Sequence, residues 1–269
     1  MTAPLPSALV EAAEAAAEAA GAVIRPLFRS PLLVEAKGDA SPVTEADRGA
    51  ERAMRAVLSA RFPDHGIWGE EYGADRAGAE WVWLLDPIDG TRAFVTGRPL
   101  FGTLVALLHR GRPVLGLIDQ PATGERWIGA AGERTRFRGP FGGAAGCRPC
   151  ARLAEAELSC TSPDIFGPAD RPGFDRLRAA VRRATWGGDC YAYGLLALGL
   201  VDVVAETTMR PWDWAALVPV VEGAGGRVTG WDGRPLALDG DGRVLAVGDP
   251  ALLAEAVALL GGGGGAAGG

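Results

Sequence analysis

An apolar run that ends in two closely spaced carboxylates constrains this chain more than any other feature. The run Trp81–Leu85 predicts a buried strand, and Pro87 ends its hydrogen-bonded ladder. Asp89 and Gly90 then predict a tight turn. Asp86, Asp89 and a main-chain carbonyl between them offer hard oxygen ligands. Such ligands suit Mg²⁺, which is usually bound by protein carboxylates and a substrate phosphate together. A purely structural reading is also open, because Asp-Pro and Asp-Gly are common turn dipeptides.

Three further motifs accompany this one in a fixed order. Lys37–Asp47 reads K-G-D-A-S-P-V-T-E-A-D, Trp68–Gly73 reads W-G-E-E-Y-G, and Pro211–Gly226 contains W-D-W-A and E-G-A-G-G. Together with Asp86–Thr91, these segments resemble the motifs of the inositol monophosphatase family, and the resemblance extends across nearly the whole chain. It implies an α/β protein that forms a layered αβαβα sandwich, with an α+β N-terminal half and an α/β C-terminal half. It also implies a metal-dependent phosphomonoesterase.

The resemblance implies a ligand set for two or three Mg²⁺ ions per active site, with Mn²⁺ as a substitute. Glu70, Asp86 and the main-chain carbonyl of Ile88 would hold the activating metal, and Asp86, Asp89 and Asp213 would hold the second. Two metals about 3.5–4 Å apart lower the pKa of an attacking water and stabilise the charge on the leaving oxygen. Taken alone, Glu70 is also consistent with a solvated turn, and Asp213 with an acidic helix cap.

Asp47 and Thr91 are the predicted catalytic pair, and Glu70 is the third predicted catalytic residue. The resemblance implies that Asp47 and Thr91 orient the nucleophilic water. Asp47 also fits the last position of a helix capping box, and the two roles are compatible. The amides of Gly90 and Thr91 are the predicted phosphate cradle. Further candidates for the site are Thr44, which opens the capping box, and the only lysine, Lys37.

Residues that flank the metal motifs favour the histidinol-phosphatase branch of this family. Histidinol phosphate carries an ammonium and an imidazole beside its phosphate, and carboxylates outside the metal site can bind the ammonium. The segments that resemble this branch are Thr91–Phe94, Gly97–Leu104, Gly116–Pro121, Gly124–Trp127, Gly188–Gly194 and Arg210–Trp214.

The predicted substrate contacts are Asp189, Glu206 and Arg210. Glu206 lies seven residues before Asp213, the spacing that the family uses for its substrate-contacting Glu. Asp189 also fits a turn, Glu206 also fits a charge at a strand end, and Arg210 could contact substrate within one subunit or across a dimer. The alternative functions are an inositol-1-phosphate phosphatase, a broad-specificity sugar or nucleotide phosphatase, and an inactive regulatory homologue.

Composition limits the partners of this chain. Its 269 residues carry a net charge of −6, without the basic stripe that nucleic-acid binding needs. No apolar run approaches the roughly 18 residues of a membrane helix. The four cysteines follow no visible export signal, so we expect reduced thiols in the cytoplasm. We expect a homodimer that acts on a small-molecule phosphate ester and binds neither nucleic acid nor membrane.

Hydrophobic periodicity predicts alternating helices and strands. Predicted helices begin at the caps Ser7 and Thr44 and cover Phe174–Arg183, Tyr191–Gly199, Trp212–Ala224 and Ala251–Leu260. Predicted strands cover Trp81–Leu85, Thr103–Leu108, Pro113–Ile118, Trp127–Ala130, Leu158–Thr161, Thr185–Trp186, Val201–Glu206 and Val244–Gly248, with a hairpin turn at Gly111-Arg112. We expect an N-terminal subdomain over residues 1–145 with most metal and phosphate ligands. A C-terminal subdomain over 146–260 would carry the substrate contacts and Asp213, and a disordered Gly/Ala tail would cover 261–269.

Missing motifs exclude other phosphate chemistry. No Gly-Lys-Ser/Thr is present to form a P-loop, and no cysteine precedes an arginine at the Cys-x₅-Arg spacing. Cys147 and Cys150 form a lone C-x₂-C without a second pair at zinc spacing, so we do not expect a zinc site. Residues 239–242, Asp-Gly-Asp-Gly, are predicted to form a hairpin turn.

Overall fold

The computed structural model describes residues 5–31, 34–36 and 42–261. Its elements, in chain order, are α1 (Ser7–Leu27), β1 (Val34–Ala36), β2 (Pro42–Thr44), α2 (Glu45–Arg61), β3 (Gly66–Gly69), β4 (Gly73–Asp75), β5 (Trp81–Asp89), α3 (Thr91–Val95), β6 (Gly102–His109), β7 (Arg112–Gln120), β8 (Glu125–Ala130), β9 (Arg136–Arg138), β10 (Glu157–Cys160), α4 (Arg171–Ala180), β11 (Arg183–Trp186), α5 (Cys190–Ala197), β12 (Val203–Glu206), α6 (Pro211–Trp214), α7 (Leu217–Gly223), β13 (Arg227–Thr229), β14 (Val244–Val247) and α8 (Leu253–Gly261), with short 3₁₀ turns at Leu153–Glu155, Pro163–Ile165 and Pro250–Leu252.

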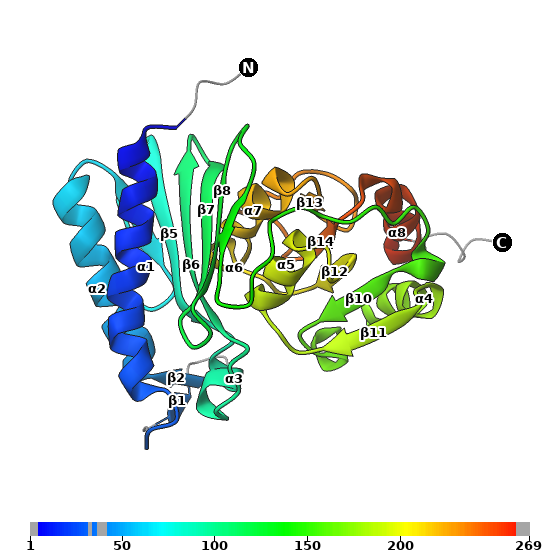
Figure 1. The fold of residues 1–269 in the computed structure, drawn as a ribbon, viewed down its shortest axis with the longest axis horizontal. Coiled ribbons are helices and arrows are strands. Elements are labelled where there is room, and N and C mark those ends of the chain that lie inside the picture. Colours follow the sequence, from blue (N-terminus) through cyan, green and yellow to red (C-terminus); the bar gives the residue numbers. More distant parts are fainter. Residues whose placement is uncertain (1–4, 32–33, 37–41, 262–269) are drawn as a thin grey trace.

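These elements stack in five layers, so the predicted αβαβα sandwich is confirmed (Figure 1). Helices α1 and α2 cover the outer face of a seven-stranded sheet of order β4-β3-β5-β6-β7-β8-β9. Helices α5, α6 and α7 fill the space between this sheet and a five-stranded sheet of order β11-β10-β12-β14-β13. Helices α4 and α8 pack on the far face of the second sheet. The predicted boundary at residues 145 and 146 falls in the connection between the sheets and stays a prediction.

The first layer is tight because α1 presents small side chains to its neighbours. Alanines recur at helical spacing along its buried face, and they have no exposed surface: Ala12, Ala13, Ala16, Ala17 and Ala20. Small side chains allow α2 to pack closely on α1 and both helices to pack on β5 and β6. This packing fixes α2, which carries Asp47, relative to β5, which carries Asp86 and Asp89.

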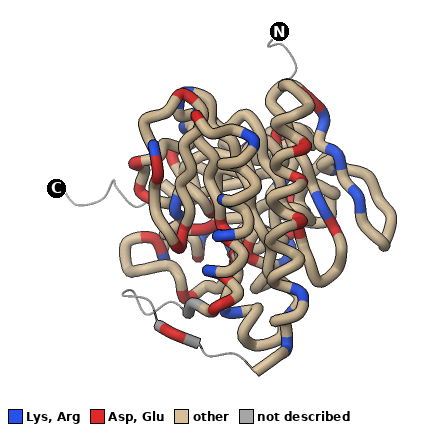
Figure 2. The backbone as a smooth tube through the Cα atoms, turned by 90° about the vertical axis from the view of Figure 1, so that its left-hand side faces the viewer, with Lys and Arg blue, Asp and Glu red and all other residues tan. Residues whose placement is uncertain are grey.

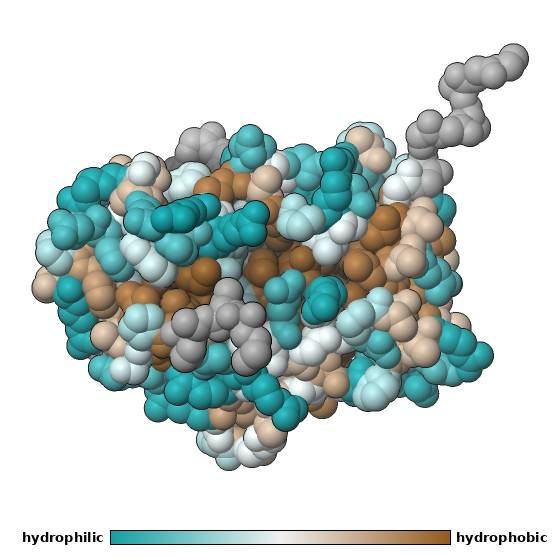
Figure 3. All heavy atoms as spheres, turned by 90° about the horizontal axis from the view of Figure 1, so that it is seen from above, coloured by the Kyte–Doolittle hydropathy of each residue, from teal (hydrophilic) through white to brown (hydrophobic). Residues whose placement is uncertain are grey.

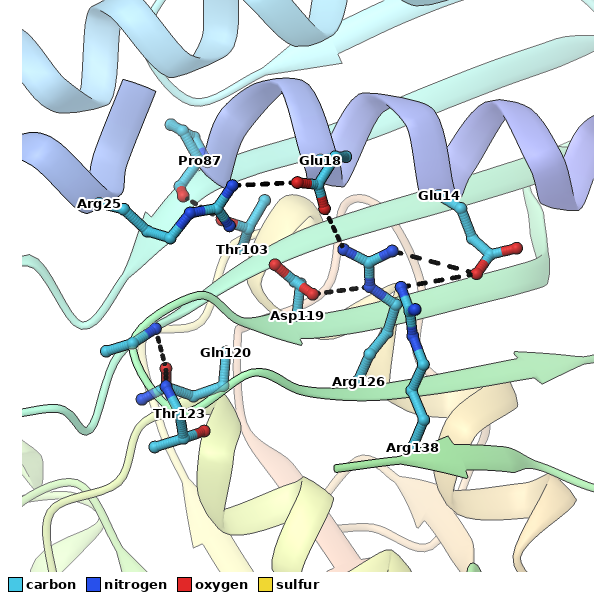
Figure 4. Close-up of polar contacts among 11 residues, drawn as sticks. Glu14, Glu18, Arg25, Pro87, Thr103, Asp119, Gln120, Thr123, Arg126 and Arg138 are labelled. Atoms are coloured by element: carbon cyan, nitrogen blue, oxygen red, sulfur yellow. Dashed lines mark hydrogen bonds and ion pairs between the residues drawn. The ribbon is translucent and has the colours of Figure 1, made fainter. Parts of the chain in front are cut away.

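A buried arginine connects α1 to the sheet at β7 and β8 (Figure 4). The Arg126 side chain is 5% exposed, and its Nε lies 2.6 Å from Asp119 Oδ1. A second nitrogen of this guanidinium lies 3.5 Å from Glu18 on α1. Burial of a charge is costly unless partners compensate it, and these acids supply the compensation. The contact therefore holds α1 in register on the sheet that carries the site.

The predicted helix Trp212–Ala224 is wrong, because the segment forms two short helices, α6 and α7. Pro219 has no N–H to donate to the carbonyl of Ala215, so one hydrogen bond of a continuous helix is missing. The break lies where the backbone passes close to β7: a Cβ added to Gly116 would lie 2.0 Å from the carbonyl oxygen of Ala216. The break leaves Asp213 on its own short helix.

Several other boundaries differ from the predictions. Pro87 does not end the strand that begins at Trp81, because β5 continues past a bulge to Asp89, which pairs with Gly102. Pro6, not Ser7, caps α1. The helix predicted at Phe174–Arg183 begins at Arg171, where a proline at the second position favours helix initiation. The β6–β7 turn is Arg110-Gly111, whose φ angles of 51° and 76° fit a type I′ turn. Gly261, predicted as tail, ends α8, and residues 262–269 lie outside the described residues.

Positively and negatively charged residues are mixed along the chain. In Figure 2, Lys and Arg positions are interspersed with Asp and Glu positions along the backbone. Figure 3 looks down onto the layers, and apolar residues fill the middle of this face between hydrophilic margins. Within the described part of the chain, no helix is both long and apolar enough to cross a membrane.

Candidate active site

The site is built on a bulge at the end of β5. Asp86 pairs with Leu104 and Asp89 pairs with Gly102, so β5 contains one residue more than β6 between these pairs. The Thr103 hydroxyl, fully buried, donates a 2.8 Å hydrogen bond to the carbonyl oxygen of Pro87 inside the bulge (Figure 4). The bulge places Asp86, the Ile88 carbonyl and Asp89 together at one end of the strand.

Asp86 lies in a cluster of acids. It is 2% exposed, and its Oδ1 has no hydrogen-bond partner among the described residues. Burial raises the pKa of Asp86 well above its ordinary value, and the negative charges of Glu70, Asp89 and Asp213 raise it further. The pKa of Asp89 is also raised, first by burial and then by Asp189 and Asp213. The structure thus brings together the four predicted metal carboxylates.

Glu70 reaches this cluster from the turn between β3 and β4. Its N–H donates a 3.1 Å hydrogen bond to the carbonyl oxygen of Leu85, which extends the parallel pairing of β3 with β5. The β3–β4 hairpin was not predicted from the sequence. Neighbouring residues are further fixed by an edge-to-face contact between Trp68 and Trp212, with ring centroids 5.7 Å apart. This contact joins the strand before Glu70 to the helix that carries Asp213.

The acid set fits a hard divalent cation. Carboxylates and a carbonyl oxygen are the ligands that Mg²⁺ prefers, and a cation would relieve the repulsion among the acids. In the described structure, no three acidic, thiol or imidazole side chains stand in the arrangement of a complete metal cluster. Two of the acids accept from backbone instead: Asp89 Oδ2 from Cys190 N–H at 2.5 Å, and Asp213 Oδ2 from Arg210 N–H at 2.7 Å. The orphaned Asp86 Oδ1 is the position that a cation would satisfy.

Asp47 and Thr91 meet beside the acids although 44 residues separate them. The Thr91 hydroxyl lies 3.2 Å from Asp47 Oδ1 and 3.0 Å from the carbonyl oxygen of Ile88. The predicted capping box is confirmed: Asp47 Oδ2 accepts from both the N–H and the hydroxyl of Thr44, at 2.7 and 2.6 Å. Burial raises the pKa of Asp47, and the hydrogen bonds from Thr44 partly offset this effect.

Gly90 forms the turn between β5 and α3 with a φ of 90°, which favours glycine. A Cβ at this position would lie 2.9 Å from Asp189 Oδ2, so the Asp189 side chain lies directly against the turn. Asp189 itself has a φ of 45°, an uncommon backbone conformation for a residue other than glycine. The close approach places Asp189 beside the predicted phosphate cradle rather than on a distant loop.

A pocket of about 130 Å³ opens beside the acids on the C-terminal side. Its lining residues are Asp89, Thr161, Ile165, Asp189, Cys190, Tyr193, Glu206, Thr207, Thr208, Met209 and Asp213. The N–H of Thr161 donates to Glu206 Oε1 at 2.7 Å. Burial raises the pKa of Glu206 to about 8 and that of Asp189 to about 6. Two of the three predicted substrate contacts therefore face the same pocket as two predicted metal ligands.

Two other predicted site residues, Arg210 and Thr44, do not line this pocket. The side chain of Arg210 is exposed and does not line the pocket, although its backbone N–H binds Asp213. Thr44 is buried against Asp47, and Lys37 lies outside the described residues. Sequence reasoning missed Thr103, Thr161 and the Cys190 amide, because a hydrogen bond to an acceptor far away in the chain leaves no pattern in the sequence.

Comparisons with known proteins identify the family of this chain. The model of the inositol monophosphatase family matches residues 6–261. In Arabidopsis thaliana, the bifunctional phosphatase IMPL2, chloroplastic, is 49% identical over 222 residues, which cover 82% of this chain and 63% of that protein. The chain thus spans less than two thirds of the length of that relative. The histidinol-phosphatase of Chlorobaculum parvum is 38% identical over 237 residues, which cover 86% of this chain and 88% of that protein.

A solved structure is also similar to this chain. An inositol monophosphatase from Zymomonas mobilis is 47% identical and superposes with a TM-score of 0.85, covering 94% of this chain and 97% of that one. The similarity therefore extends over nearly the whole chain.

Proposed function

This chain belongs to the inositol monophosphatase family and is a phosphatase, and from that premise we propose that it hydrolyses L-histidinol phosphate to L-histidinol and phosphate. The alternative within the family is inositol 1-phosphate, or a broad range of sugar and nucleotide phosphates. The observation that carries the choice is Glu206, a buried carboxyl that faces the same pocket as Asp89 and Asp213.

Mg²⁺ is the proposed cofactor. Glu70, Asp86 and the Ile88 carbonyl would hold one ion, and Asp86, Asp89 and Asp213 a second. Bound there, Mg²⁺ would lower the pKa of a water and neutralise charge on the phosphate oxygens. The amides of Gly90 and Thr91 would hold the phosphate beside these ligands.

Asp47 and Thr91 are proposed to orient and deprotonate the attacking water. The Thr91 hydroxyl can donate to only one acceptor at a time, and Asp47 Oδ1 and the Ile88 carbonyl oxygen both lie within reach. Thr44 holds Asp47 Oδ2, so Oδ1 is the atom left to interact through Thr91. A raised pKa makes Asp47 a better proton acceptor than an exposed aspartate.

The pocket carboxyls favour an ammonium-bearing ester. Glu206, whose pKa is about 8, is mostly protonated in the free protein near neutral pH, and an ammonium partner would favour its ionised form. Asp189, which lies between Glu206 and the Gly90 turn, adds a second acid. Inositol 1-phosphate offers only neutral hydroxyl groups beyond its phosphate. It is retained as the alternative because the Zymomonas relative is an inositol monophosphatase and carboxylates also accept hydroxyl hydrogen bonds.

Glu206→Gln tests the substrate, since it keeps the shape and the Thr161 contact but removes the charge. A charge-assisted hydrogen bond contributes roughly 1.5–3 kcal/mol, so kcat/KM for histidinol phosphate should fall about 10- to 100-fold. Glycerol 2-phosphate, which has no ammonium, should change far less. An equal fall for both esters would assign Glu206 to the support of the metal ligands instead.

A cytoplasmic homodimer completes the proposal. All four cysteines, Cys147, Cys150, Cys160 and Cys190, are free thiols, as expected for a reducing compartment. Light scattering of the purified protein measures the assembly, and a monomer mass at working concentration would contradict the dimer.

A further inference from the structure

A buried carboxylate on α2 contacts the turn that carries Glu70. Glu51 has no exposed surface, yet it lies on a helix whose other charged residues mostly reach solvent. Its Oε2 accepts a 2.7 Å hydrogen bond from the N–H of Glu71, and its Oε1 accepts a 3.2 Å hydrogen bond from the N–H of Tyr72. Twenty residues separate Glu51 from Glu71 in the chain, so this contact is tertiary.

Arg55, one helical turn further along α2, completes the arrangement. Its Nε lies 2.7 Å from Glu51 Oε1, and another guanidinium nitrogen donates a 2.5 Å hydrogen bond to the carbonyl oxygen of Gly73. The Glu51–Arg55 pair therefore accepts from two consecutive amides of the turn and donates to the carbonyl that follows them. The buried charge is balanced locally, as burial of an ion requires.

The residue before Glu70 is in contact with the same carboxylate. A Cβ added to Gly69 would lie 2.1 Å from Glu51 Oε1, so this position has no room for a side chain. Gly69 and Glu71, the neighbours of Glu70 on both sides, are therefore positioned by one buried group. The N–H of Glu70 is bound separately by the Leu85 carbonyl, which fixes the turn against β5.

We propose that Glu51 is a positioning residue that sets the direction of the Glu70 carboxylate toward the metal site. The inference rests on the proposed role of Glu70 as a metal ligand. Mutation of a residue that orients a metal ligand typically lowers metal affinity or activity by about 10- to 100-fold. Glu51 is outside the proposed ligand set, and it would act through the backbone on both sides of Glu70.

Glu51→Gln tests the proposal, because glutamine keeps the shape but presents an NH₂ group to donors. The Mg²⁺ concentration for half-maximal activity should rise about 10- to 100-fold, and the Mg²⁺-dependent rise in melting temperature should move to the same higher concentration. At saturating Mg²⁺, KM for the ester should remain near the wild-type value. Amide hydrogen exchange across residues 70–73 should be faster than in the wild type.

Two further variants complete this experiment. Glu45→Gln makes the same chemical change at an exposed position of α2 and should leave the Mg²⁺ requirement unchanged. Arg55→Gln, which keeps both carboxylate–amide contacts, should raise the Mg²⁺ requirement by less than Glu51→Gln does. It also serves as the test variant if Glu51→Gln does not fold.

Glu70→Gln distinguishes the proposed role of Glu70 as a metal ligand from the proposed role of Glu51 as a positioning residue. If Glu70→Gln leaves the Mg²⁺ requirement unchanged, the ligand assignment itself is wrong. If Glu70→Gln raises the requirement but Glu51→Gln only accelerates amide exchange, Glu51 stabilises the turn without positioning the ligand, and the inference is overturned.

Discussion

The hydroxyl of Thr91 lies 3.2 Å from Oδ1 of Asp47, and this contact joins the start of α3 to the first turn of α2. Both helices begin at the acid cluster: Thr91 follows the β5 bulge, and Asp47 is held in place by the Thr44 cap. The contact therefore brings a proton acceptor and a hydroxyl next to the predicted metal ligands. This arrangement is what water activation requires.

Thr91→Val should lower kcat by about 10²-fold or more, the contribution typical of a positioned proton-transfer group. Valine has the same shape but no hydroxyl, so the Asp47 contact is lost while the packing is kept. Thr91→Ser, which retains the hydroxyl, should preserve most of the activity. Steady-state kinetics at saturating Mg²⁺ measures both, and equal rates for Thr91→Val and the wild type would remove Thr91 from the mechanism.

Asp86→Asn should stabilise the metal-free protein while it abolishes activity. The folded-state pKa of Asp86 is raised, so the ionised form costs stability at any pH above the ordinary aspartate value. A neutral asparagine removes that cost. In a chelator at pH 8, the variant should melt above the wild type, and the difference should shrink as the pH falls towards 4. A variant that melts below the wild type at pH 8 would show that the acid cluster does not strain the metal-free fold.

Glu206 should make stability fall as the pH rises. Its pKa is raised from 4.5 to about 8 by folding, so the folded state holds one more proton than the unfolded state between these values. The wild type and Glu206→Gln should therefore have similar unfolding free energies at pH 4.5, and the variant should be the more stable at pH 9. Denaturant titrations at both pH values measure this difference, with Glu255→Gln on exposed α8 surface as the control. A constant difference at both pH values would contradict the raised pKa.

Thr103→Val should weaken the site through the β5 bulge. The variant leaves the buried carbonyl of Pro87 without its hydroxyl donor, which costs about 1–3 kcal/mol. Because this carbonyl lies between two predicted ligands, we expect a higher Mg²⁺ requirement as well as a lower melting temperature, and Thr103→Ser should restore both. If Thr103→Val lowers the melting temperature but leaves the Mg²⁺ requirement unchanged, the role of Thr103 is structural only.

Local signals allowed much of this molecule to be predicted. The Thr44 capping box is written in four consecutive residues, and its hydrogen bonds are present. The start of β5 at Trp81 follows from the apolar run, and the layered fold follows from the resemblance of the ordered motifs to those of the inositol monophosphatase family. The roles assigned to the metal and substrate residues stay predictions, although the structure places most of them side by side.

Features that depend on tertiary contacts could not be predicted from the sequence. The break between α6 and α7 depends on Pro219 and on close packing against Gly116, and the β3–β4 hairpin has too few residues for a clear pattern. The role of Glu51 could not be predicted either, because nothing in the sequence shows that its side chain faces the turn at Glu71.

The most direct test of the account is phosphate release from L-histidinol phosphate and inositol 1-phosphate, measured side by side with the wild-type protein in Mg²⁺. A pocket lined by two carboxyls beyond the metal ligands, the buried Glu206 and the half-buried Asp189, predicts a higher kcat/KM for histidinol phosphate, and an advantage that is lost in Glu206→Gln. A wild-type protein with the higher kcat/KM for inositol 1-phosphate would contradict the substrate assignment.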